Sequence, residues 1–209
     1  GEIIRRITKK SVGKFISDEL SNKKDLYCYI GVPCEFHSRI SEVISMKENS
    51  KLNLNRKISD KYSNYGFNNP PSLKNSDNLK EWRTAEIPSL NCHANASTLA
   101  RIYDQFVNDD KSLIIDKKIF NKALSVESNR MDYVMRVPIK WSPIGLIIDG
   151  GKLFGDSKRA FGHTGSGGSI AFADPEKKLS ISYTSNTLSK SLIGDKRAIK
   201  LVSKFYELF

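Results

Sequence analysis

The sequence has no long apolar run, few cysteines and no paired metal-binding motif. No stretch approaches the roughly 20 apolar residues that a membrane-spanning helix needs, and no signal-peptide pattern opens the chain, which begins at Gly1 without a methionine. The three cysteines, Cys28, Cys34 and Cys92, contain no CxxC pair, and their odd number argues against a disulfide framework. We therefore expect no membrane span, reduced thiols, and an intracellular location, cytoplasmic or mitochondrial, rather than secretion.

The sequence also shows no pattern for binding a metal, a nucleotide or a nucleic acid. No cluster of His, Cys, Asp or Glu has metal-ligand spacing, and Gly150-Gly151 lacks the strand–GxGxxG–helix context of a nucleotide loop. We therefore expect neither a metal nor an organic cofactor. The formal net charge of +11 would favour nucleic-acid binding if the charges clustered. They are spread along the chain, mostly beside acids, so we expect a solvated basic surface and no nucleic-acid partner.

The first part of the chain, residues 1–130, is predicted to be mainly helical. The composition, 39% hydrophobic and 27% charged, is typical of a folded domain, and 209 residues are enough to bury a core. Hydrophobic periodicity fails from Glu48 to Leu90, which we interpret as a long irregular excursion. Elsewhere apolar spacing predicts helices over Glu2–Leu20 with Ser11 as a fresh N-cap, Pro33–Met46, Asn95–Asn108, and Asp116–Leu124 with Ile119 and Phe120 facing inward.

The second part, residues 131–209, changes from helical spacing to extended apolar runs. Glycine-rich and Asp-Pro links join the later runs, and such short links are typical of hairpins in an antiparallel meander. A final helix is predicted over Asp195–Phe209. The fold class we predict is α+β, an antiparallel sheet flanked by helices within a single region, 1–209. The extended runs are Trp141–Ile148, Ala160–Thr164, Ser169–Ala173 and Leu179–Thr184.

The segment Phe161-Gly-His-Thr-Gly-Ser-Gly-Gly-Ser169 is the strongest candidate for a chemical site. A strand that ends in His-Thr-Gly before further glycines exposes backbone N–H groups along an edge, because no Cβ shields them. Such an N–H can stabilise an oxyanion, and His163 and Thr164 can bind a carboxylate or relay a proton. The alternative is a glycine-rich hairpin whose histidine merely lies on the surface.

This segment, with Leu179-Ser-Ile-Ser-Tyr-Thr-Ser-Asn186, resembles the third active-site motif and following strands of the serine β-lactamase-related family. That family comprises class C-like penicillin-recognising enzymes, esterases and their eukaryotic homologues. Glu86–Tyr103, with Pro88-Ser-Leu-Asn-Cys-His93, is similar to the family's Pro-Ser-x-Asn-Gly-His stretch and the helix after it. Gly1–Ile7, Ser11–Ile16 and Tyr29–Pro33 look like the segment that follows the family's second motif. The resemblance therefore covers nearly the whole chain, in the family's order.

The resemblance implies a role for each residue of the third motif. His163, in place of the lysine usual in classical β-lactamases, would contact the substrate carboxylate or carbonyl, and Thr164 would supply a hydroxyl. Gly165 would keep the edge narrow, and the backbone N–H of Ser166 would form half of the oxyanion hole. Gly167, Asn91 and His93 are weaker candidates for substrate binding, since a loop-bonding role explains Asn91 and His93 as well, and Cys92 replaces the family's usual glycine.

The family's nucleophile is a serine in Ser-x-x-Lys, assisted by a tyrosine from its second motif, and both precede the region that matches Gly1. The resemblance thus implies a C-terminal part of a β-lactamase/transpeptidase-like domain, without its nucleophile, lysine and tyrosine. Its partners would be the missing N-terminal part, or a second copy of the chain, and an ester, amide or lactam substrate that is hydrolysed through an acyl-serine. His in place of Lys favours esters or peptides over lactams.

Two alternatives remain at this stage. Ser-x-x-Lys occurs within the chain at Ser11–Lys14 and Ser21–Lys24, and Tyr62-Ser-Asn imitates the second motif, so an internal site of Ser11, Lys14, Tyr62 and His163 is conceivable. With this many serines and lysines, chance alone supplies such matches. The other alternative is a non-catalytic interaction or assembly domain that keeps the fold but has lost the reaction. Whether the chain is an enzyme is therefore open from the sequence.

Overall fold

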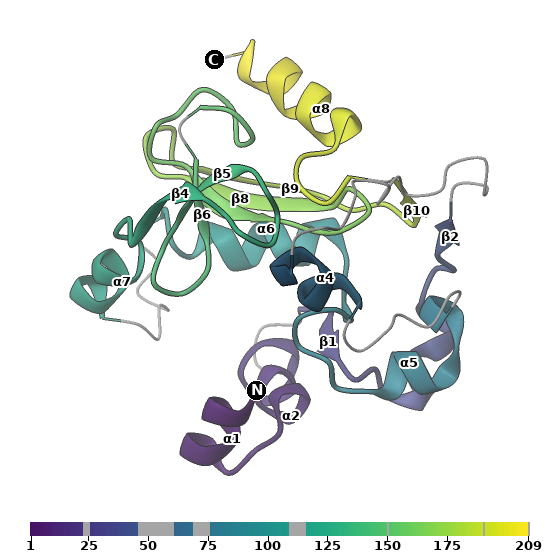
Figure 1. Ribbon diagram of the computed structural model, residues 1–209. Coiled ribbons are helices and arrows are strands. Elements are labelled where there is room, and N and C mark those ends of the chain that lie inside the picture. Colours follow the sequence, from purple (N-terminus) through teal and green to yellow (C-terminus); the bar gives the residue numbers. More distant parts are fainter. Residues whose placement is uncertain are drawn as a thin grey trace. The chain divides into compact units, whose positions relative to one another are not determined.

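The computed structural model describes residues 1–22, 26–45, 61–68, 76–108, 116–149, 151–189 and 191–208. The chain forms two compact units, one of Gly1–Ile44 with Leu73–Leu99 and the other of Ser45–Ser72 with Ala100–Phe209 (Figure 1). Helices and antiparallel strands together confirm the α+β class. That residues 1–209 form a single region stays a prediction.

The first unit contains short helices and a two-stranded sheet. Ser11 caps a new helix as predicted, because its side chain accepts a hydrogen bond from the Lys14 N–H. The strands of the sheet are antiparallel, with Tyr29 opposite His93. The helical elements are α1 (Glu2–Thr8), α2 (Val12–Ile16), the π-helical turn η1 (Ser17–Ser21), the 3₁₀ turns η2 (Cys34–Arg39) and η3 (Ser76–Asn78), and α5 (Lys80–Thr84), and the strands are β1 (Cys28–Ile30) and β3 (Cys92–Ala94).

The helix predicted from Pro33 to Met46 is wrong within the described residues. Only the 3₁₀ turn η2 forms, and Ile40 is already extended, with φ −85° and ψ 122°. The side chain of Asn78 then binds the backbone of Val43 on both sides, accepting from its N–H at 2.8 Å and donating to its carbonyl at 2.9 Å. These long-range bonds hold an extended backbone, which leads into strand β2 (Ile44–Ser45), and they outweigh the local helical spacing. Met46 lies outside the described residues.

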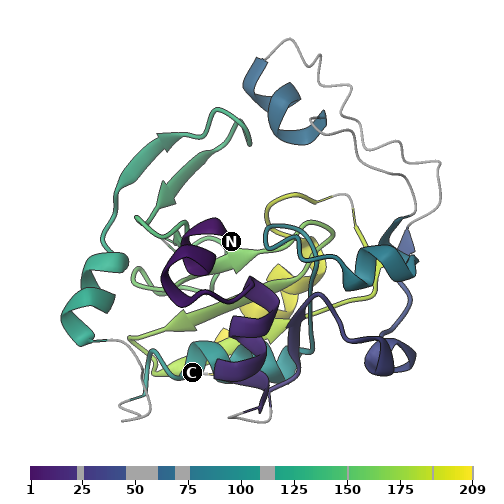
Figure 2. The same cartoon turned by 90° about the horizontal axis from the view of Figure 1, so that it is seen from below.

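The second unit is built on a six-stranded antiparallel sheet in the order β4-β5-β6-β7-β8-β9, a meander as predicted. Strand β8 is buried at every position, and its neighbours cover both of its edges. Figure 2 shows these strands from below. Their bounds are β4 (Ser128–Met131), β5 (Pro138–Trp141), β6 (Ile147–Ile148), β7 (Phe161–Thr164), β8 (Ile170–Asp174) and β9 (Leu179–Tyr183), followed by β10 (Thr187–Leu188).

The run from Trp141 to Ile148, predicted as one extended segment, is a turn between two strands. The Ser142 N–H donates to the Leu146 carbonyl at 2.9 Å, and the Gly145 N–H donates back to Ser142 at 3.0 Å. Gly145 has φ +79°, a conformation that glycine adopts without a steric penalty. The apolar character of the run concealed a turn that its Pro-x-Gly sequence signals.

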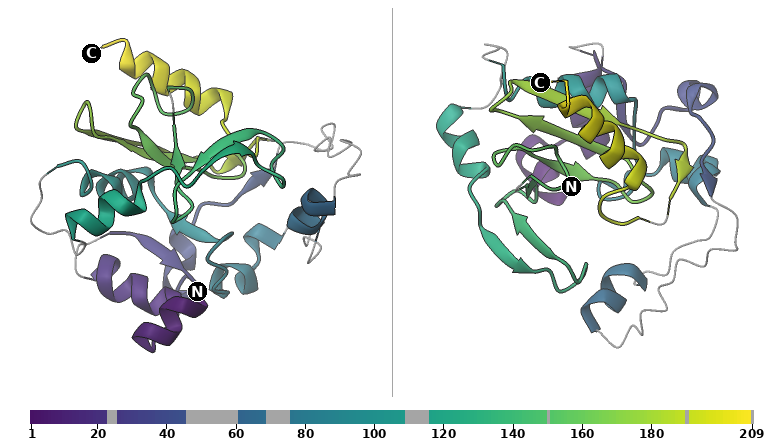
Figure 3. Two further views of the ribbon diagram at one scale, coloured as in Figure 1. Left: turned by 60° about the vertical axis from the view of Figure 1, so that its left-hand side comes forward. Right: turned by 90° about the horizontal axis from the view of Figure 1, so that it is seen from above.

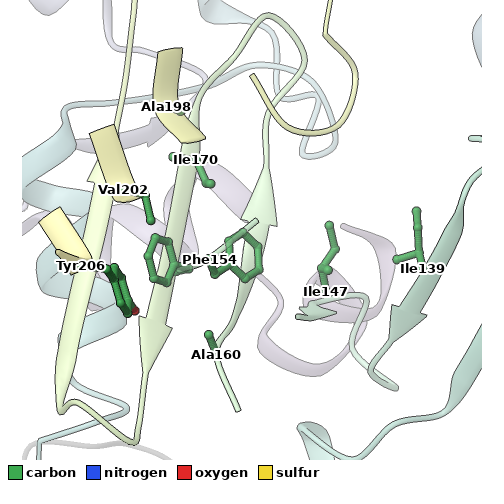
Figure 4. Packing of buried hydrophobic residues seen from close by; sticks show 9 residues of the cluster. Ile139, Ile147, Phe154, Ala160, Ile170, Ala198, Val202 and Tyr206 are labelled. Atoms are coloured by element: carbon green, nitrogen blue, oxygen red, sulfur yellow. The ribbon is translucent and has the colours of Figure 1, made fainter. Parts of the chain in front are cut away.

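Helix α8 (Lys196–Tyr206) packs on one face of the sheet, as the right-hand view in Figure 3 shows. Ala198, Val202 and Tyr206 are buried there against Ile170 and Phe172 of β8, and Phe154 stacks on Phe172 with ring centroids 5.0 Å apart (Figure 4). The predicted final helix is thus confirmed from its cap at Asp195, but it ends at Tyr206. Phe209 lies outside the described residues.

Aromatic residues cover Phe161, at the beginning of β7. Tyr103 of α6 (Ala96–Asp104) and Phe106 lie near its ring, and Phe120 of α7 (Lys117–Ala123) approaches it to 5.7 Å between centroids. Phe120 therefore faces inward as predicted. Ile119 does not, because the helix turns it outward and leaves it 65% exposed.

The irregular excursion predicted from Glu48 to Leu90 includes short helices where the structure describes it. Besides η3 and α5, helix α4 (Lys61–Asn68) packs on the loop after β4, where Ser63 donates a hydrogen bond to the Val134 carbonyl at 2.7 Å. Residues 48–60 and 69–75 lie outside the described part. No helix in the described ranges has the length and apolar character needed to cross a membrane.

Candidate active site

The glycine loop after β7, residues 165–168, has one backbone N–H that no described residue accepts. The Gly165 N–H donates to Ser169 at 2.7 Å, the Gly167 N–H to Ser191 at 3.1 Å, and the Gly168 N–H back to Gly165 at 3.2 Å. Ser166 is exposed, and within the described part of the chain its N–H has no acceptor. The N–H groups on both sides of Ser166 are therefore bonded, whereas that of Ser166 belongs to an exposed residue and has no described acceptor, as an oxyanion donor requires.

His163 lies directly before this loop and is exposed at the end of β7. Its Nδ1 lies 2.7 Å from the Thr164 carbonyl oxygen, which can only accept, so Nδ1 carries the proton. In the neutral ring Nε2 then holds a lone pair, and no described residue bonds to it. This tautomer makes His163 an acceptor on its open side, unlike a lysine, which only donates.

Trp141, which the sequence placed only at the start of an extended run, lies against the His163 ring. The two ring centroids are 5.8 Å apart, at 31°. The Trp141 indole donates to Asp132 Oδ2 at 2.9 Å, and Asp132 Oδ1 accepts from the Val134 and Met135 N–H groups. Burial alone would raise the pKa of Asp132, but these three hydrogen bonds outweigh it and lower the pKa. Asp132 therefore stays ionised and fixes the indole that limits where the imidazole can turn.

Thr164 is 5% exposed, and its hydroxyl has no hydrogen-bond partner among the described residues. Buried hydroxyls are almost always bonded, so this group retains an unused donor and acceptor next to the glycine loop. The sequence predicted that Thr164 presents its hydroxyl to a substrate. The structure buries the hydroxyl more deeply than that prediction assumed.

The glycine loop is supported from behind by the beginning of α8. Arg197 donates to the Gly167 carbonyl at 3.2 Å and to the Thr187 carbonyl at 3.0 Å, and Asp195 holds the same guanidinium at 3.0 Å. A Cβ at Gly168, which has φ +118°, would lie 2.8 Å from Asp195 Oδ2. The sequence analysis did not find this support, because the three segments are distant in sequence and only folding brings them together.

Replacing Asp195 by Asn should make the free energy of unfolding less dependent on pH in the acid range. The Arg197 hydrogen bond, outweighing burial, lowers the pKa of Asp195 to about 2. Since this pKa lies below the unfolded value of about 3.9, Asp195 stabilises the fold above about pH 4, by about 1 kcal/mol after solvent screening, and this is lost as the pH falls towards 2. Asn still caps α8. Urea midpoints of the two proteins should differ most near neutral pH and converge in acid; a constant difference contradicts the assignment.

Asn91 and His93 lie in the first unit, and the structure describes that unit separately from the His163 loop. Asn91 is 2% exposed, and its carboxamide accepts from the Ile87 N–H and donates to the Trp82 and Ala85 carbonyls at 2.8 and 2.6 Å. These three bonds favour the loop-bonding alternative for Asn91. His93 Nδ1 donates to the Asn91 carbonyl at 2.9 Å, and burial lowers the pKa of His93, so its ring is neutral near pH 7.

The internal Ser-x-x-Lys candidate is engaged in other contacts. The Ser11 hydroxyl donates to Glu86 at 2.7 Å while it caps α2, and the Lys14 amine pairs with Asp18 at 2.8 Å. Tyr62 belongs to α4 in the second unit, where its ring lies 5.9 Å from that of Tyr133. The second candidate, Ser21–Lys24, ends outside the described residues. Ser11 and Lys14 therefore have structural partners of their own.

Neither metal binding nor a hollow beside Phe161 points to another reaction centre among the described residues. Among the described residues, no group of three His, Cys, Asp or Glu side chains could hold a metal ion. A hollow of about 330 Å³ opens near Phe161, at the opposite end of β7 from the glycine loop, between Lys158, Arg159 and Asn121. Its lining has no nucleophile or imidazole, so we place the candidate site at His163.

An antiparallel sheet with His-Thr-Gly at the end of one strand, and a C-terminal helix packed on one face of that sheet, is the arrangement of the β-lactamase/transpeptidase fold. A family model described as Beta-lactamase matches residues 1–204, and the chain belongs to this family. No curated protein matches the chain.

Solved structures show the same fold. A penicillin-binding protein homolog from Caulobacter crescentus matches with a TM-score of 0.81 and 28% identity, over 100% of this chain and 56% of its own. A family VIII carboxylesterase matches with a TM-score of 0.82 and 28% identity, over 100% and 55%. EstA from Arthrobacter nitroguajacolicus Rue61a, at 24% identity and a TM-score of 0.80 over 99% and 56%, supports the fold alone. The chain thus spans about half the length of these proteins.

Proposed function

We propose that the chain is the third-motif part of a serine hydrolase of the β-lactamase family, acting on esters, amides or lactams through an acyl-serine. The observation that carries the proposal is the glycine loop, in which the Ser166 N–H has no acceptor among the described residues, three positions after His163, whose Nε2 has no described partner either. The nucleophilic serine, its lysine and the tyrosine would come from residues that precede Gly1. No metal or organic cofactor is needed for this chemistry.

Each residue of the loop has a distinct role in the proposed reaction. When the serine attacks the carbonyl, negative charge develops on the carbonyl oxygen, and the Ser166 N–H would donate to it, beside the N–H of the nucleophile. His163 Nε2 would accept a hydrogen bond from substrate or from the attacking hydroxyl, with Trp141 holding the ring. The Thr164 hydroxyl is buried without a described partner, so it would bond a polar group of the substrate only after a shift of the loop exposes it, and Gly165 and Gly167 would let the substrate approach the backbone.

Esters are the substrates that this geometry favours. A lysine holds a carboxylate by its permanent charge, and lactam antibiotics carry such a carboxylate. The His163 imidazole, which presents an open acceptor instead of a permanent charge, offers no comparable attraction, whereas an ester needs only the oxyanion donor and proton transfer. A family VIII carboxylesterase is among the matching structures, but its 28% identity equals that of the penicillin-binding protein homolog, so the preference for esters rests on His163.

We also propose that the partner is an N-terminal part of the same domain, with self-association as the alternative. Strand β9 is an edge of the sheet, and all five of its residues are only half-buried. On α1, Ile3 and Ile7 are 74% and 76% exposed. An added strand at β9 and a segment that covers α1 would remove an exposed sheet edge and exposed apolar surface.

Three free cysteines support a reducing compartment, cytoplasmic or mitochondrial.

The test is hydrolysis of p-nitrophenyl acetate and nitrocefin by residues 1–209 alone and by a longer polypeptide with Ser-x-x-Lys upstream of Gly1. We expect the chain alone to stay at background and the longer polypeptide to be at least about 10³-fold faster on the ester, because losing the nucleophile costs a serine hydrolase roughly 10⁶-fold in kcat and this chain would hold only half of the oxyanion hole. His163→Ala should lower the longer protein's rate, and His37→Ala should not, because the His37 ring bonds the Val32 carbonyl within the first unit.

An inactive longer polypeptide that binds partner proteins would instead support the non-catalytic alternative. Observed hydrolysis by residues 1–209 alone would contradict the proposal that the nucleophile lies upstream.

A further inference from the structure

Two of the three cysteines lie in contact within the first unit, far apart in sequence. Cys28 of β1 and Cys92 of β3 have their Sγ atoms 3.7 Å apart. In the antiparallel register Cys28 is opposite Ala94, and Ile30 is opposite Cys92. Both sulfurs are therefore on the same face of the two-stranded sheet, at diagonal positions, since side chains two residues apart along a strand share a face.

We propose that Cys28 and Cys92 form a reversible disulfide when the protein meets a hydroperoxide. The sulfurs must approach by about 1.7 Å to reach the roughly 2.05 Å of an S–S bond. Rotation of the two side chains, together with a small shift of short strands, supplies this movement. Cys34, in η2, is exposed and has no sulfur neighbour among the described residues, so it serves as an internal control.

The two thiols differ in a way that assigns their roles. Cys92 is exposed, whereas Cys28 is 5% exposed, so an oxidant reaches Cys92 first. Either sulfur can donate in the contact between them. Once Cys92 is a thiolate, the Cys28 thiol is the donor, and this hydrogen bond lowers the pKa of Cys92 against the opposing effect of burial. The same interaction, with burial, raises the pKa of Cys28. Cys92 is therefore the attacking thiolate, and Cys28 is the thiol that resolves it.

The reaction takes two balanced steps. The Cys92 thiolate attacks one oxygen of hydrogen peroxide, the O–O bond breaks, hydroxide leaves, and Cys92 becomes a sulfenic acid. The Cys28 sulfur then attacks the Cys92 sulfur; the S–S bond forms, the S–O bond breaks, and the departing hydroxide takes the Cys28 proton. Two thiols lose two electrons, and the peroxide is reduced to two waters. The first step also removes the Cys92 anion, the main cause of the raised Cys28 pKa.

The disulfide would form beside residues whose hydrogen bonds hold neighbouring loops. Cys92 stands between Asn91, whose carboxamide bonds three backbone groups of residues 82–87, and His93. The Ser21 hydroxyl donates to the Cys28 carbonyl at 2.9 Å. A disulfide would therefore link β1 covalently to β3, and a thiol reductant would release it.

The test is oxidation of residues 1–209, folded, with hydrogen peroxide, followed by alkylation of remaining thiols and peptide mapping without reductant. We expect loss of two hydrogens, a Cys28–Cys92 linked peptide, alkylated Cys34, and full reversal by dithiothreitol. Cys34→Ser should behave identically, and Cys92→Ser and Cys28→Ser should not form the bond. In urea-unfolded chain the sequence-near pair Cys28–Cys34 should form instead, since short loops close more readily.

Three results would overturn the proposal. They are a sulfinic acid at Cys92 with Cys28 still free, a native disulfide that includes Cys34, and dimers linked between chains. As an independent readout, Cys92 should be alkylated at lower pH than Cys34, and Cys28→Ala should remove that difference; an unchanged profile contradicts the assigned order of attack.

Discussion

Replacing Ser166 by proline is expected to lower kcat for ester hydrolysis by about 10² to 10³ in the longer hydrolase, with the fold intact. The Gly168 N–H donates to the Gly165 carbonyl, which closes a turn with Ser166 second and Gly167, at φ +90°, third. That is the pattern of a type II turn, in which proline is favoured at the second position. The substitution therefore preserves the turn and removes only the N–H that no described residue accepts.

Ser166→Ala is the matched control, because it removes the hydroxyl and keeps the N–H. Its kcat should stay within about threefold of the unchanged enzyme if the backbone group carries the effect. Both variants should unfold within a few degrees of the parent. Equal losses of kcat in the two variants would assign the role to the hydroxyl, and no loss in either would remove Ser166 from the site.

Gly155→Ala is expected to destabilise the second unit by about 3 kcal/mol or more. Gly155 has φ +82°, and a Cβ there would overlap the ring of Tyr206. The ring cannot move freely, since its hydroxyl donates at 2.7 Å to Asp174, which is fully buried. If the ring moved, Asp174 would keep its hydrogen bond from the Glu176 N–H but lose the one from Tyr206. Losing a hydrogen bond to a buried charged group costs about 1.5–3 kcal/mol.

Gly145→Ala separates the clash from the backbone effect. Gly145 has nearly the same φ, +79°, but nothing lies within 4 Å of its added Cβ. It should lose only about 1 kcal/mol, the cost of a left-handed backbone for alanine. Urea unfolding of the three proteins gives both numbers. If the two variants lose the same free energy of unfolding, the packing of the Tyr206 ring does not require a residue without Cβ at position 155.

The stability of α8 bears on the site because its first turn holds the glycine loop. Arg197 contacts the loop carbonyl of Gly167, and Tyr206 fixes the other end of the helix on the sheet. A destabilised α8 should therefore also loosen the loop that presents the Ser166 N–H.

Local patterns in the sequence were sufficient to predict the meander and its last helix. The apolar spacing of each of these elements is visible in consecutive residues. The glycine loop joins β7 to β8 and the Asp-Pro link joins β8 to β9, so the hydrophobic pattern and the turn residues predict the same strands. The Ser11 cap was predicted for the same reason. The helix from Pro33 failed because Asn78, far along the chain, binds Val43 and holds it extended.

The partners of the candidate site lacked any such local signal. His163 and the loop could be named from one short motif, but Trp141 reaches His163 across the sheet, and Asp132 orients Trp141 through its indole. Arg197 reaches Gly167 from 30 residues away. A hydrogen bond between distant residues leaves no period in the sequence, so only the folded chain reveals these three positions.

The central claim is that this chain supplies the oxyanion wall but not the nucleophile, and labelling with a fluorophosphonate tests it most directly. Residues 1–209 should remain unlabelled, and the longer polypeptide should take one label, on a serine of an upstream Ser-x-x-Lys, with the Ser11→Ala variant labelled to the same extent. Labelling of residues 1–209 that disappears in Ser11→Ala would contradict the account and place the nucleophile within the chain.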